Sequence, residues 1–378
     1  MAVLVLAAVA PAVALDYGIN SSLIGYQISL ISFGMMLTLT LLGNTSKRYG
    51  AARTNQIGHA FIASGILILL IPWLPFLIVG SLIIGLGYGM ITPSASHLLM
   101  RYTLPHRRST VFSIHQIGIP AGGILASSIA PAITVYASWH WAVLFSASLL
   151  VCVVLLMQVR RHHWDDDRDQ SAAIITPNPF AGTQAIWAHP KLRLATLAGS
   201  CFSWVQFCTA TFTVVACVSV LQMDLLIAGT VLSVVQLSSA AGRVLMGWIV
   251  DCINNTIIVL GFNAAILIIA TIATLFLTPE LPLFAIYILF AVLGATSGSW
   301  PGVLLSEVGR LAPSGNVSLA ISGSLVITNV GKFLGPIIFV NMYAYSQQYT
   351  LTFAALTVPA VIALYSLYAA QQQSEQTT

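Results

Sequence analysis

The sequence predicts an all-α membrane protein with twelve transmembrane helices, and three observations support this prediction. Of the 378 residues, 58% are apolar and only 6% carry a formal charge, which is too few to cover a water-facing surface. The apolar residues form continuous runs of about 20, the length that crosses roughly 30 Å of hydrocarbon as a helix. The connectors between these runs alternate between basic and acidic. A transmembrane barrel would instead show strands of about ten residues with alternating polarity.

Twelve of the fourteen Lys and Arg residues lie in alternate connectors. They are Lys47, Arg48, Arg53, Arg101, Arg107, Arg108, Arg160, Arg161, Arg168, Lys191, Arg193 and Arg310. The intervening connectors lie near residues 16, 73–75, 137–139, 224 and 280, and their only formal charges are acidic. The positive-inside rule therefore predicts that the basic connectors and the C-terminus lie on the cytoplasmic side of a bacterial-type inner membrane.

The apolar runs predict the spans in order. They cover residues 1–15, 25–45, 56–74, 77–100, 110–135, 140–159, 194–220, 226–250, 256–278, 281–305, 316–341 and 350–370. The first run is short, since only about fourteen apolar residues separate Met1 from Asp16. One interpretation is a secretory signal that lacks the usual basic start; the other, which we prefer, is a first helix whose cytoplasmic turns are missing.

Residues of the same kind recur at offsets of 204 to 208, which predicts a duplicated six-helix unit. Gly25, Ser29 and Gly43 correspond to Gly229, Ser233 and Gly247, and Pro93 and Pro105 correspond to Pro301 and Pro313. We expect helical bundles at 1–159 and 194–370 and a cytoplasmic tail at 371–378. Between the bundles, 160–193 is interpreted as a flexible, solvated linker, with a metal-sensing role for His162 and His163 as the alternative.

Two motifs carry a resemblance to a known family. One reads Gly43-Asn44-Thr45-Ser46-Lys47-Arg48-Tyr49-Gly50-Ala51-Ala52, and the other reads Gly242-Arg243-Val244-Leu245-Met246-Gly247-Trp248-Ile249-Val250-Asp251. They resemble the two copies of the Gly-x-x-x-Asp-Arg-x-Gly-Arg-Arg signature of the major facilitator superfamily (MFS), although Lys47 stands in place of the acid. The resemblance implies the MFS fold of two pseudo-symmetric six-helix bundles. The sequence around His115 and Pro120 also resembles, more loosely, the branch of this superfamily that includes cyanate and nitroimidazole transporters.

The resemblance also implies a latch, because in the family this loop packs against the other half and its acid helps to close the cytoplasmic side. Lys47 reverses that charge, so we expect it to pair with Glu307 or, alternatively, only to add to the cytoplasmic positive charge. Asp251 is expected to pair with Arg243 or with Arg107 and Arg108. The predicted gating and latch residues are Gly43, Lys47, Arg48, Gly50, Pro120, Arg243, Gly247, Asp251 and Glu307.

The predicted binding site centres on Lys332, because a charge inside a span is costly and marks a functional candidate. Helical spacing places Asn329 on the same face. His115 and Gln116 form a polar pair in the opposite half, and Gln206 and Gln236 are weaker inward-facing candidates. No predicted span contains Asp or Glu, so these basic groups favour a small anion as substrate. The alternative to a binding role is that the polar residues belong to the core and have their hydrogen bonds satisfied there. For Lys332, the alternative is a side chain that extends toward the lipid headgroups.

The sequence therefore predicts a secondary transporter of a small organic or inorganic anion that works by alternating access as a monomer, with a proton as a second candidate partner. Efflux of amphiphilic compounds in exchange for protons is the alternative, and a non-transporting membrane sensor is the alternative from another class. We expect no enzyme, since the spans hold no catalytic spacing. No cofactor, metal site or nucleic-acid partner is expected either.

Overall fold

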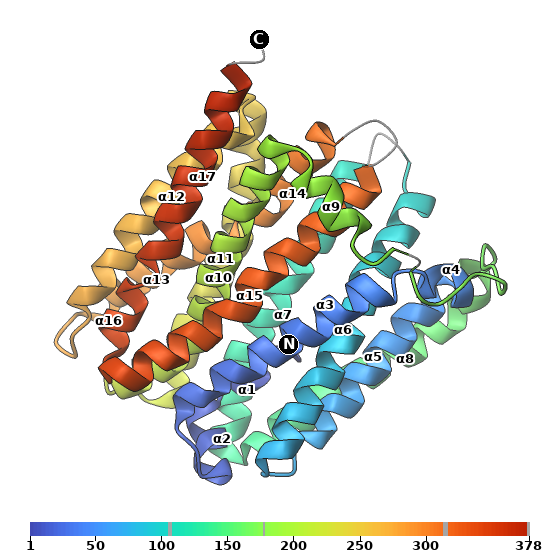
Figure 1. Cartoon of the computed structure of the whole chain (residues 1–378). Helices are drawn as coiled ribbons and strands as arrows, with labels where there is room; N and C mark the ends of the chain where they lie inside the picture. The colour runs from blue at the N-terminus through green and yellow to red at the C-terminus, as the bar shows by residue number, and fades with distance from the viewer. Residues whose placement is uncertain (105–107, 177, 313–316, 376–378) are drawn as a thin grey trace.

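The computed structural model describes residues 1–104, 108–176, 178–312 and 317–375, without the side chains of residues 100, 108–114, 317–319 and 374–375. These residues form a helical bundle in which α5, α6 and α8 lie at one side and α12, α13 and α17 at the other (Figure 1). Helices α3, α7, α10, α11 and α15 lie between them. The chain is thus built in the all-α class that its composition predicts.

The first half contains eight α-helices and a short 3-10 turn. They are α1 (Val5–Ala8), α2 (Ala10–Tyr17), η1 (Ser21–Leu23), α3 (Ile24–Leu41), α4 (Thr45–Tyr49), α5 (Ala51–Ile68), α6 (Leu74–Tyr102), α7 (Arg108–Tyr136) and α8 (Trp139–Trp164). The remaining helices are α9 (Ala181–Trp187), α10 (Pro190–Ser219), α11 (Leu225–Ile253), α12 (Thr256–Ala273), η3 (Thr274–Phe276), α13 (Leu283–Gly298), α14 (Trp300–Leu311), α15 (Val317–Ser346), α16 (Tyr349–Ala354) and α17 (Thr357–Glu375).

Within the described residues, ten helical segments are long and apolar enough to cross a membrane. The predicted runs 1–15 and 56–74 are not among them. The first is divided into α1 and α2 at Val9, and both pieces are short. The second begins earlier than predicted, as α5, and its first turns carry the polar side chains of Arg53, Asn55 and His59. Both segments still lie in the bundle: α1 is wholly buried, and α5 packs against α6 and α8.

The packing of the first half recurs in the second. Helix α3 packs on α6 as α11 packs on α13, and α5 packs on α8 as α12 packs on α17. Between the halves, α3 contacts α15 and α7 contacts α11. This is the arrangement expected of a duplicated six-helix unit whose copies meet around a central axis.

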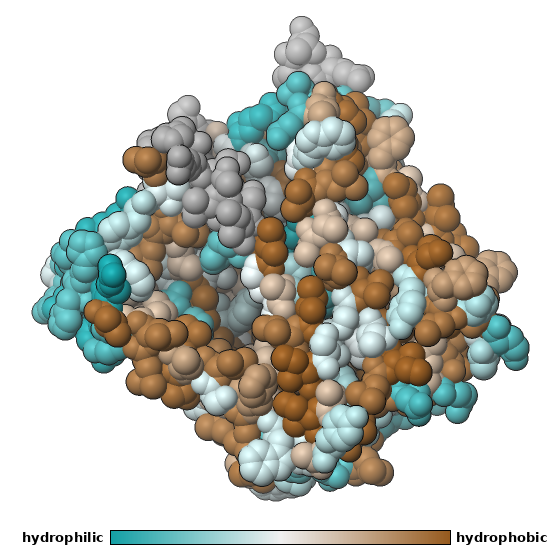
Figure 2. All heavy atoms as spheres, turned by 180° about the vertical axis from the view of Figure 1, so that it is seen from behind, coloured by the Kyte–Doolittle hydropathy of each residue, from teal (hydrophilic) through white to brown (hydrophobic). Residues whose placement is uncertain are grey.

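The outer surface is apolar, as a bilayer-facing surface must be. Figure 2 shows hydrophobic atoms across the middle of one face and hydrophilic atoms gathered mainly along its edges. Among the exposed side chains are Phe262, Ile269 and Tyr365. Large apolar side chains, which a water-soluble protein would bury, therefore cover much of the outside of this protein.

The connector after α8 is more ordered than predicted. Helix α8 continues to Trp164, so the linker predicted to begin at residue 160 begins about one turn later. Asp165 is only 5% exposed, and α9 packs against α15 with Gly182 and Ile186 buried. The prediction of a solvated, flexible linker is therefore wrong for these parts, because hydrogen bonds and apolar contacts hold them on the bundle.

The described residues contain no group of three or more His, Cys, Asp and Glu side chains placed to hold a metal ion.

Helices α5 and α6 approach each other closely at paired glycines. A methyl group on Gly65 would lie 2.7 Å from the carbonyl oxygen of Gly80 and 2.9 Å from the nitrogen of Ile84. Both are backbone atoms, so the helices would have to separate. We expect Gly65→Ala to lower the free energy of unfolding by about 1–2 kcal/mol, the range for overpacking. Thermal melting in detergent measures this loss.

Gly118→Ala is the matched control for Gly65→Ala, since nothing lies within 4 Å of the added methyl group at Gly118. It should melt within a degree or two of the original protein or slightly above it, because alanine favours a helix over glycine. Equal melting temperatures for both variants would contradict the close helix packing.

Candidate functional site

A cavity of about 120 Å³ lies between the two halves. Its walls come from α3 and α6, from α7, and from α10, α11, α14 and α15. The described lining residues are Met35, Tyr88, Thr92, Gln116, Ile119, Ser203, Gln206, Phe207, Arg243, Trp300, Pro301, Leu305, Leu325, Thr328, Asn329 and Lys332. Two of them are basic and none is acidic. The cavity therefore suits an anion better than a cation.

Lys332 is buried in the wall of this cavity, with 4% of its surface exposed. Its Nζ lies 4.2 Å from the centre of the Phe207 ring and 5.2 Å from that of Tyr88, within the range of cation–π attraction. Within the described part of the chain, Lys332 forms neither a hydrogen bond nor an ion pair. The ammonium group is thus held by aromatic faces and lacks a counter-charge from the protein.

Arg243 lines the same cavity from α11. Its Nε donates to the carbonyl of Gly298 at 3.0 Å, and its Nη1 donates to the carbonyl of Gln116 at 2.8 Å. Gly298 is the last residue of α13, so its carbonyl has no hydrogen-bond partner within that helix. The guanidinium therefore joins α11 and α13 to α7 of the opposite half, through two neutral acceptors.

The amide side chains of the cavity are partly fixed. The indole of Trp300 donates to Oε1 of Gln206 at 3.0 Å. An indole N–H can only donate, so the amide oxygen must point toward Trp300, and the amino group of Gln206 remains as a donor. Asn329 is 7% exposed and donates to the carbonyl of Leu325 at 2.7 Å. The amino group of Gln206 and the two cationic side chains are donors at the cavity, which favours a ligand with acceptor oxygens.

The structure brings together four of the six predicted binding residues: Lys332, Asn329, Gln116 and Gln206. Gln236 is buried elsewhere, at the contact of α11 with Gly123 of α7. His115 is half-buried and is not among the described lining residues, whereas its neighbour Gln116 is. Adjacent residues on a helix point about 100° apart, so only one of the pair can face the cavity squarely.

Sequence reasoning missed Arg243 as a cavity residue, because the family signature placed it at the gate. It also missed Tyr88, the aromatic partner of Lys332 from the first half. The available signal for Arg243 was its position eight residues before Asp251, about 12 Å deeper along α11. The predicted pairing of Asp251 with Arg243 is not observed, since the guanidinium binds two carbonyls instead. The alternative partners, Arg107 and the Arg108 side chain, lie outside the described residues.

A second cavity of about 490 Å³ adjoins the first. It shares Gln116, Arg243 and Leu305 with the central cavity and extends along α11 to Gly247 and Asp251. These residues lie toward the basic end of the bundle, defined here as the end where α3, α6 and α8 finish. Gln116 and Arg243 therefore stand where the two cavities join.

The halves meet at the other end of the bundle. Ser127 of α7 and Ser233 of α11 are hydrogen-bonded at 2.8 Å, and Asn341 of α15 donates to Tyr26 of α3 at 3.3 Å. The central cavity thus continues toward the basic end, while side chains from both halves join at the opposite end.

The predicted latch residues near α4 are held by the connector after α8, at residues 165–176. The backbone carbonyl of Lys47 accepts a hydrogen bond from the backbone N–H of Asp169 at 2.8 Å, and the guanidinium of Arg48 donates to the carbonyl of Ala172 at 2.9 Å. Gly50 has φ 90° and lies against the carboxylate of Asp165, where a side chain would collide. Gly43 lies beside Thr176.

The expected Lys47–Glu307 pair is not formed. Glu307 is 2% exposed and accepts hydrogen bonds from Arg310 at 2.6 and 2.9 Å, one helical turn away. A local partner on the same helix satisfies this carboxylate, so Lys47 is not needed to neutralise it. Asp251, in turn, is exposed at the end of α11.

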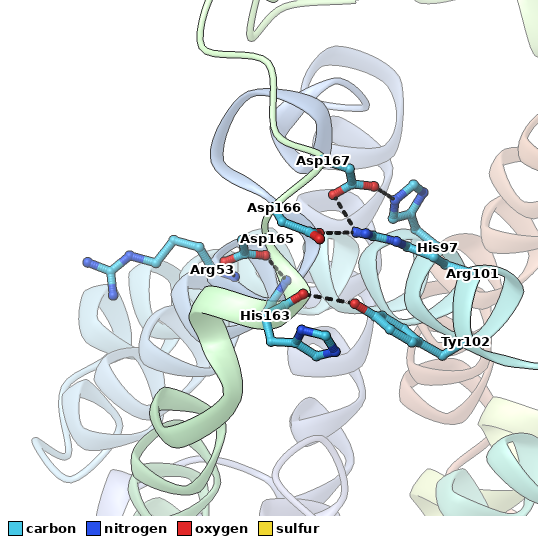
Figure 3. A network of polar contacts seen from close by, with 9 residues as sticks. Arg53, His97, Arg101, Tyr102, His163, Asp165, Asp166 and Asp167 are labelled. Atoms are coloured by element: carbon cyan, nitrogen blue, oxygen red, sulfur yellow. Dashed lines mark hydrogen bonds and ion pairs between the residues drawn. The ribbon is translucent and has the colours of Figure 1, made fainter.

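Three consecutive aspartates of the connector join α5, α6 and α8 at the basic end (Figure 3). Asp165 accepts hydrogen bonds from the backbone nitrogens of Ala52 at 2.7 Å and Arg53 at 3.0 Å. Asp166 and Asp167 form ion pairs with Arg101, and Asp167 also contacts His97 at 2.7 Å. The hydrogen bond from Arg101 lowers the pKa of Asp166 below its usual value. Asp165 thus brings an acid to the family-signature loop, where Lys47 occupies the usual acidic position.

A bundle of membrane helices whose two halves enclose a charged central cavity is the architecture of a membrane transporter. The sequence profile of the Major Facilitator Superfamily matches residues 1–336, and the chain therefore belongs to this superfamily. This confirms the family and the fold predicted from the two motifs.

Among similar proteins, the 4-hydroxybenzoate transporter PcaK of Acinetobacter baylyi is 22% identical over 95% of this chain and 85% of its own length. A homologue of the multi-drug resistance efflux pump PmrA from Lactococcus lactis is 27% identical over 35% of this chain and 33% of its own. Among solved structures, the fucose:proton symporter FucP of E. coli aligns with a TM-score of 0.63 at 14% identity, covering 98% of this chain and 97% of its own. The structural similarity at this identity shows the fold alone.

Proposed function

We propose that this transporter carries a small organic anion, bound in the central cavity between Lys332 and Arg243. The observation that supports the proposal most is the buried ammonium of Lys332, which lacks a counter-charge among the described residues. Burying an unpaired charge costs several kcal/mol, and a bound carboxylate offsets that cost. Gln206, Gln116 and Asn329 supply further polar groups to the site.

The size and the walls of the cavity favour a compact carboxylate with an apolar or aromatic body. A volume of about 120 Å³ is close to that of engineered cavities that hold one benzene ring. Phe207, Tyr88 and Trp300 provide aromatic faces. The similarity to a protein named as a 4-hydroxybenzoate transporter points to the same class of ligand.

Transport proceeds by alternating access in this proposal, with the bundles at 1–159 and 194–370 rocking about the cavity. The basic end faces the cytoplasm of a bacterial-type inner membrane, in line with the positive-inside rule. The residues near α4, together with Pro120, Gly247, Asp251 and Glu307, form the gating region at or beside the second cavity. The Arg243 bond to the carbonyl of Gln116 crosses between the halves and belongs to both the site and the gate.

Carboxylates and their neutral amides test the proposal, because each pair differs mainly in charge. We expect 4-hydroxybenzoate and benzoate to raise the melting temperature of the purified protein, while 4-hydroxybenzamide and benzamide leave it unchanged. At about 100 times the Kd, binding adds about 2.7 kcal/mol to the stability of the native state. A thermal-shift assay in detergent, or calorimetry, measures the effect.

Efflux of amphiphilic compounds is the alternative function. Stabilisation by tetraphenylphosphonium, an amphiphilic cation, with no response to either carboxylate would favour it. The two basic groups in the cavity oppose a cationic ligand by charge repulsion.

A further inference from the structure

The central cavity carries two positive charges that the protein does not neutralise. Lys332 contacts the rings of Phe207 and Tyr88, and the two hydrogen bonds described for Arg243 go to neutral carbonyls. No described lining residue is acidic. The empty site therefore holds a net positive charge in a largely apolar surrounding.

The acidic residues whose side chains the structure describes, which are all those of the chain except Glu375, are placed where they do not compensate this charge. The chain has ten in all: Asp16, Asp165, Asp166, Asp167, Asp169, Asp224, Asp251, Glu280, Glu307 and Glu375. Glu307 is bound by Arg310, and Asp16 accepts a hydrogen bond from Trp139. The nearest to Arg243 along its helix is Asp251, about 12 Å away. No carboxylate of the central cavity is thus available to take up or release a proton during transport.

A carrier that works by alternating access must pass through a state in which its site is closed to both sides. Closure removes water, and in the lower dielectric the uncompensated charges of Lys332 and Arg243 become more costly. A bound anion cancels much of this cost. The loaded carrier can therefore change its orientation much more readily than the empty one.

Arg243 adds a second link between the anion and the movement. In this structure its guanidinium holds Gln116 of α7, across the boundary between the halves. A hydrogen bond from guanidinium to carboxylate is roughly twice as strong as one to a neutral carbonyl. An anion in the cavity competes for the same N–H groups and loosens the contact between the halves.

We propose, building on the function above, that the protein is an obligate anion exchanger: it returns across the membrane only with an anion bound, and it needs no proton gradient. One carboxylate moves inward for each that moves outward. The contact of Arg243 with Gln116 links the two halves until an anion competes for its N–H groups.

Proteoliposomes of the full-length protein test this proposal, with radiolabelled 4-hydroxybenzoate as the external probe. Two vesicle sets are compared, one loaded with unlabelled 4-hydroxybenzoate and one loaded with an uncharged osmolyte. We expect initial uptake into the loaded set to be faster by at least about tenfold, since several kcal/mol oppose the return of the empty carrier. Addition of a proton ionophore should leave this ratio unchanged.

Each other outcome has a defined meaning. Equal uptake into both sets would overturn the exchange proposal and leave anion transport standing. Uptake into unloaded vesicles that appears only with an acidic exterior would also overturn exchange and would indicate proton-coupled symport, for example through Lys332. No uptake into either set, together with no thermal shift by the carboxylates, would overturn the proposed function itself.

Asn329→Asp provides a second test, because it places a carboxylate one helical turn from Lys332. The built-in counter-charge should let the empty carrier return, so uptake into unloaded vesicles should rise relative to loaded ones. Asn329→Leu is the matched control, since it loses the same hydrogen bond to Leu325 without adding a charge. An unchanged uptake ratio for Asn329→Asp in a folded protein would contradict the charge-based mechanism.

Discussion

Lys332→Met is expected to make the unliganded protein more stable and to abolish its response to carboxylates. Methionine has a similar length and removes a charge that is buried at 4% exposure without a counter-ion. Desolvation of such a charge costs several kcal/mol, and the lost cation–π contacts with Phe207 and Tyr88 return about 1–2 kcal/mol of that. A net gain of about 2 kcal/mol in the free energy of unfolding should appear as a melting temperature several degrees higher.

A gain in stability together with a loss of the response to carboxylates distinguishes a binding role for Lys332 from a structural one. A lysine that only stabilised the fold would give a less stable variant when replaced, and the remaining protein would still respond to benzoate. Loss of the thermal shift in a variant that melts higher can come only from loss of the ligand contact. This pattern is expected where a functional site retains a group at the expense of stability.

Lys191→Met is the matched control, because it makes the same chemical change in the first turn of α10, outside the described cavity lining. Its stability should stay within about 0.5 kcal/mol of the original protein, and its response to carboxylates should be retained. A variant of Lys332 that melts lower and still responds to benzoate would contradict the proposed anion site.

The sequence predicted most of the long helices and the placement of Lys332 inside the bundle, because both depend on the cost of polar groups in hydrocarbon. That cost acts on each residue separately and is visible in composition and charge order. The cost of polar groups predicts the bounds of a helix less well where polar side chains of that helix bond to neighbouring helices. The first turns of α5 are polar because Asn55 bonds Ser94 of α6 and Gln56 bonds α8, and the predicted run therefore began too late.

The contacts of the gate could not be predicted from the sequence, since they depend on which of several charged groups meet in space. Glu307 binds Arg310 on its own helix, and Arg243 binds one carbonyl at the end of α13, that of Gly298, and one inside α7, that of Gln116.

Asp165→Ala is expected to be among the most destabilising single changes at the basic end of the bundle. The Asp165 carboxylate accepts the backbone N–H groups of Ala52 and Arg53 in the first turn of α5, which has no side-chain cap from its own N-cap residue, Gly50. It also lies 3.6 Å from Nε of the largely buried Arg161. Alanine leaves these donors without a partner, at an expected cost of about 2–4 kcal/mol. Thermal melting and the yield of folded protein both measure this loss.

Asp166→Asn is the matched control, because it removes the charge of the neighbouring aspartate, whose side chain is 52% exposed. The pair that it forms with Arg101 is solvated, so the change should have little effect on melting. Asp165→Asn should lie between the two, since its amide keeps one acceptor oxygen for the helix terminus. If Asp165→Ala melted like Asp166→Asn, the connector would not secure α5. Loss of transport at unchanged stability would instead assign Asp165 a role in gating, because the residue would then act on the movement of the halves and not on their folding.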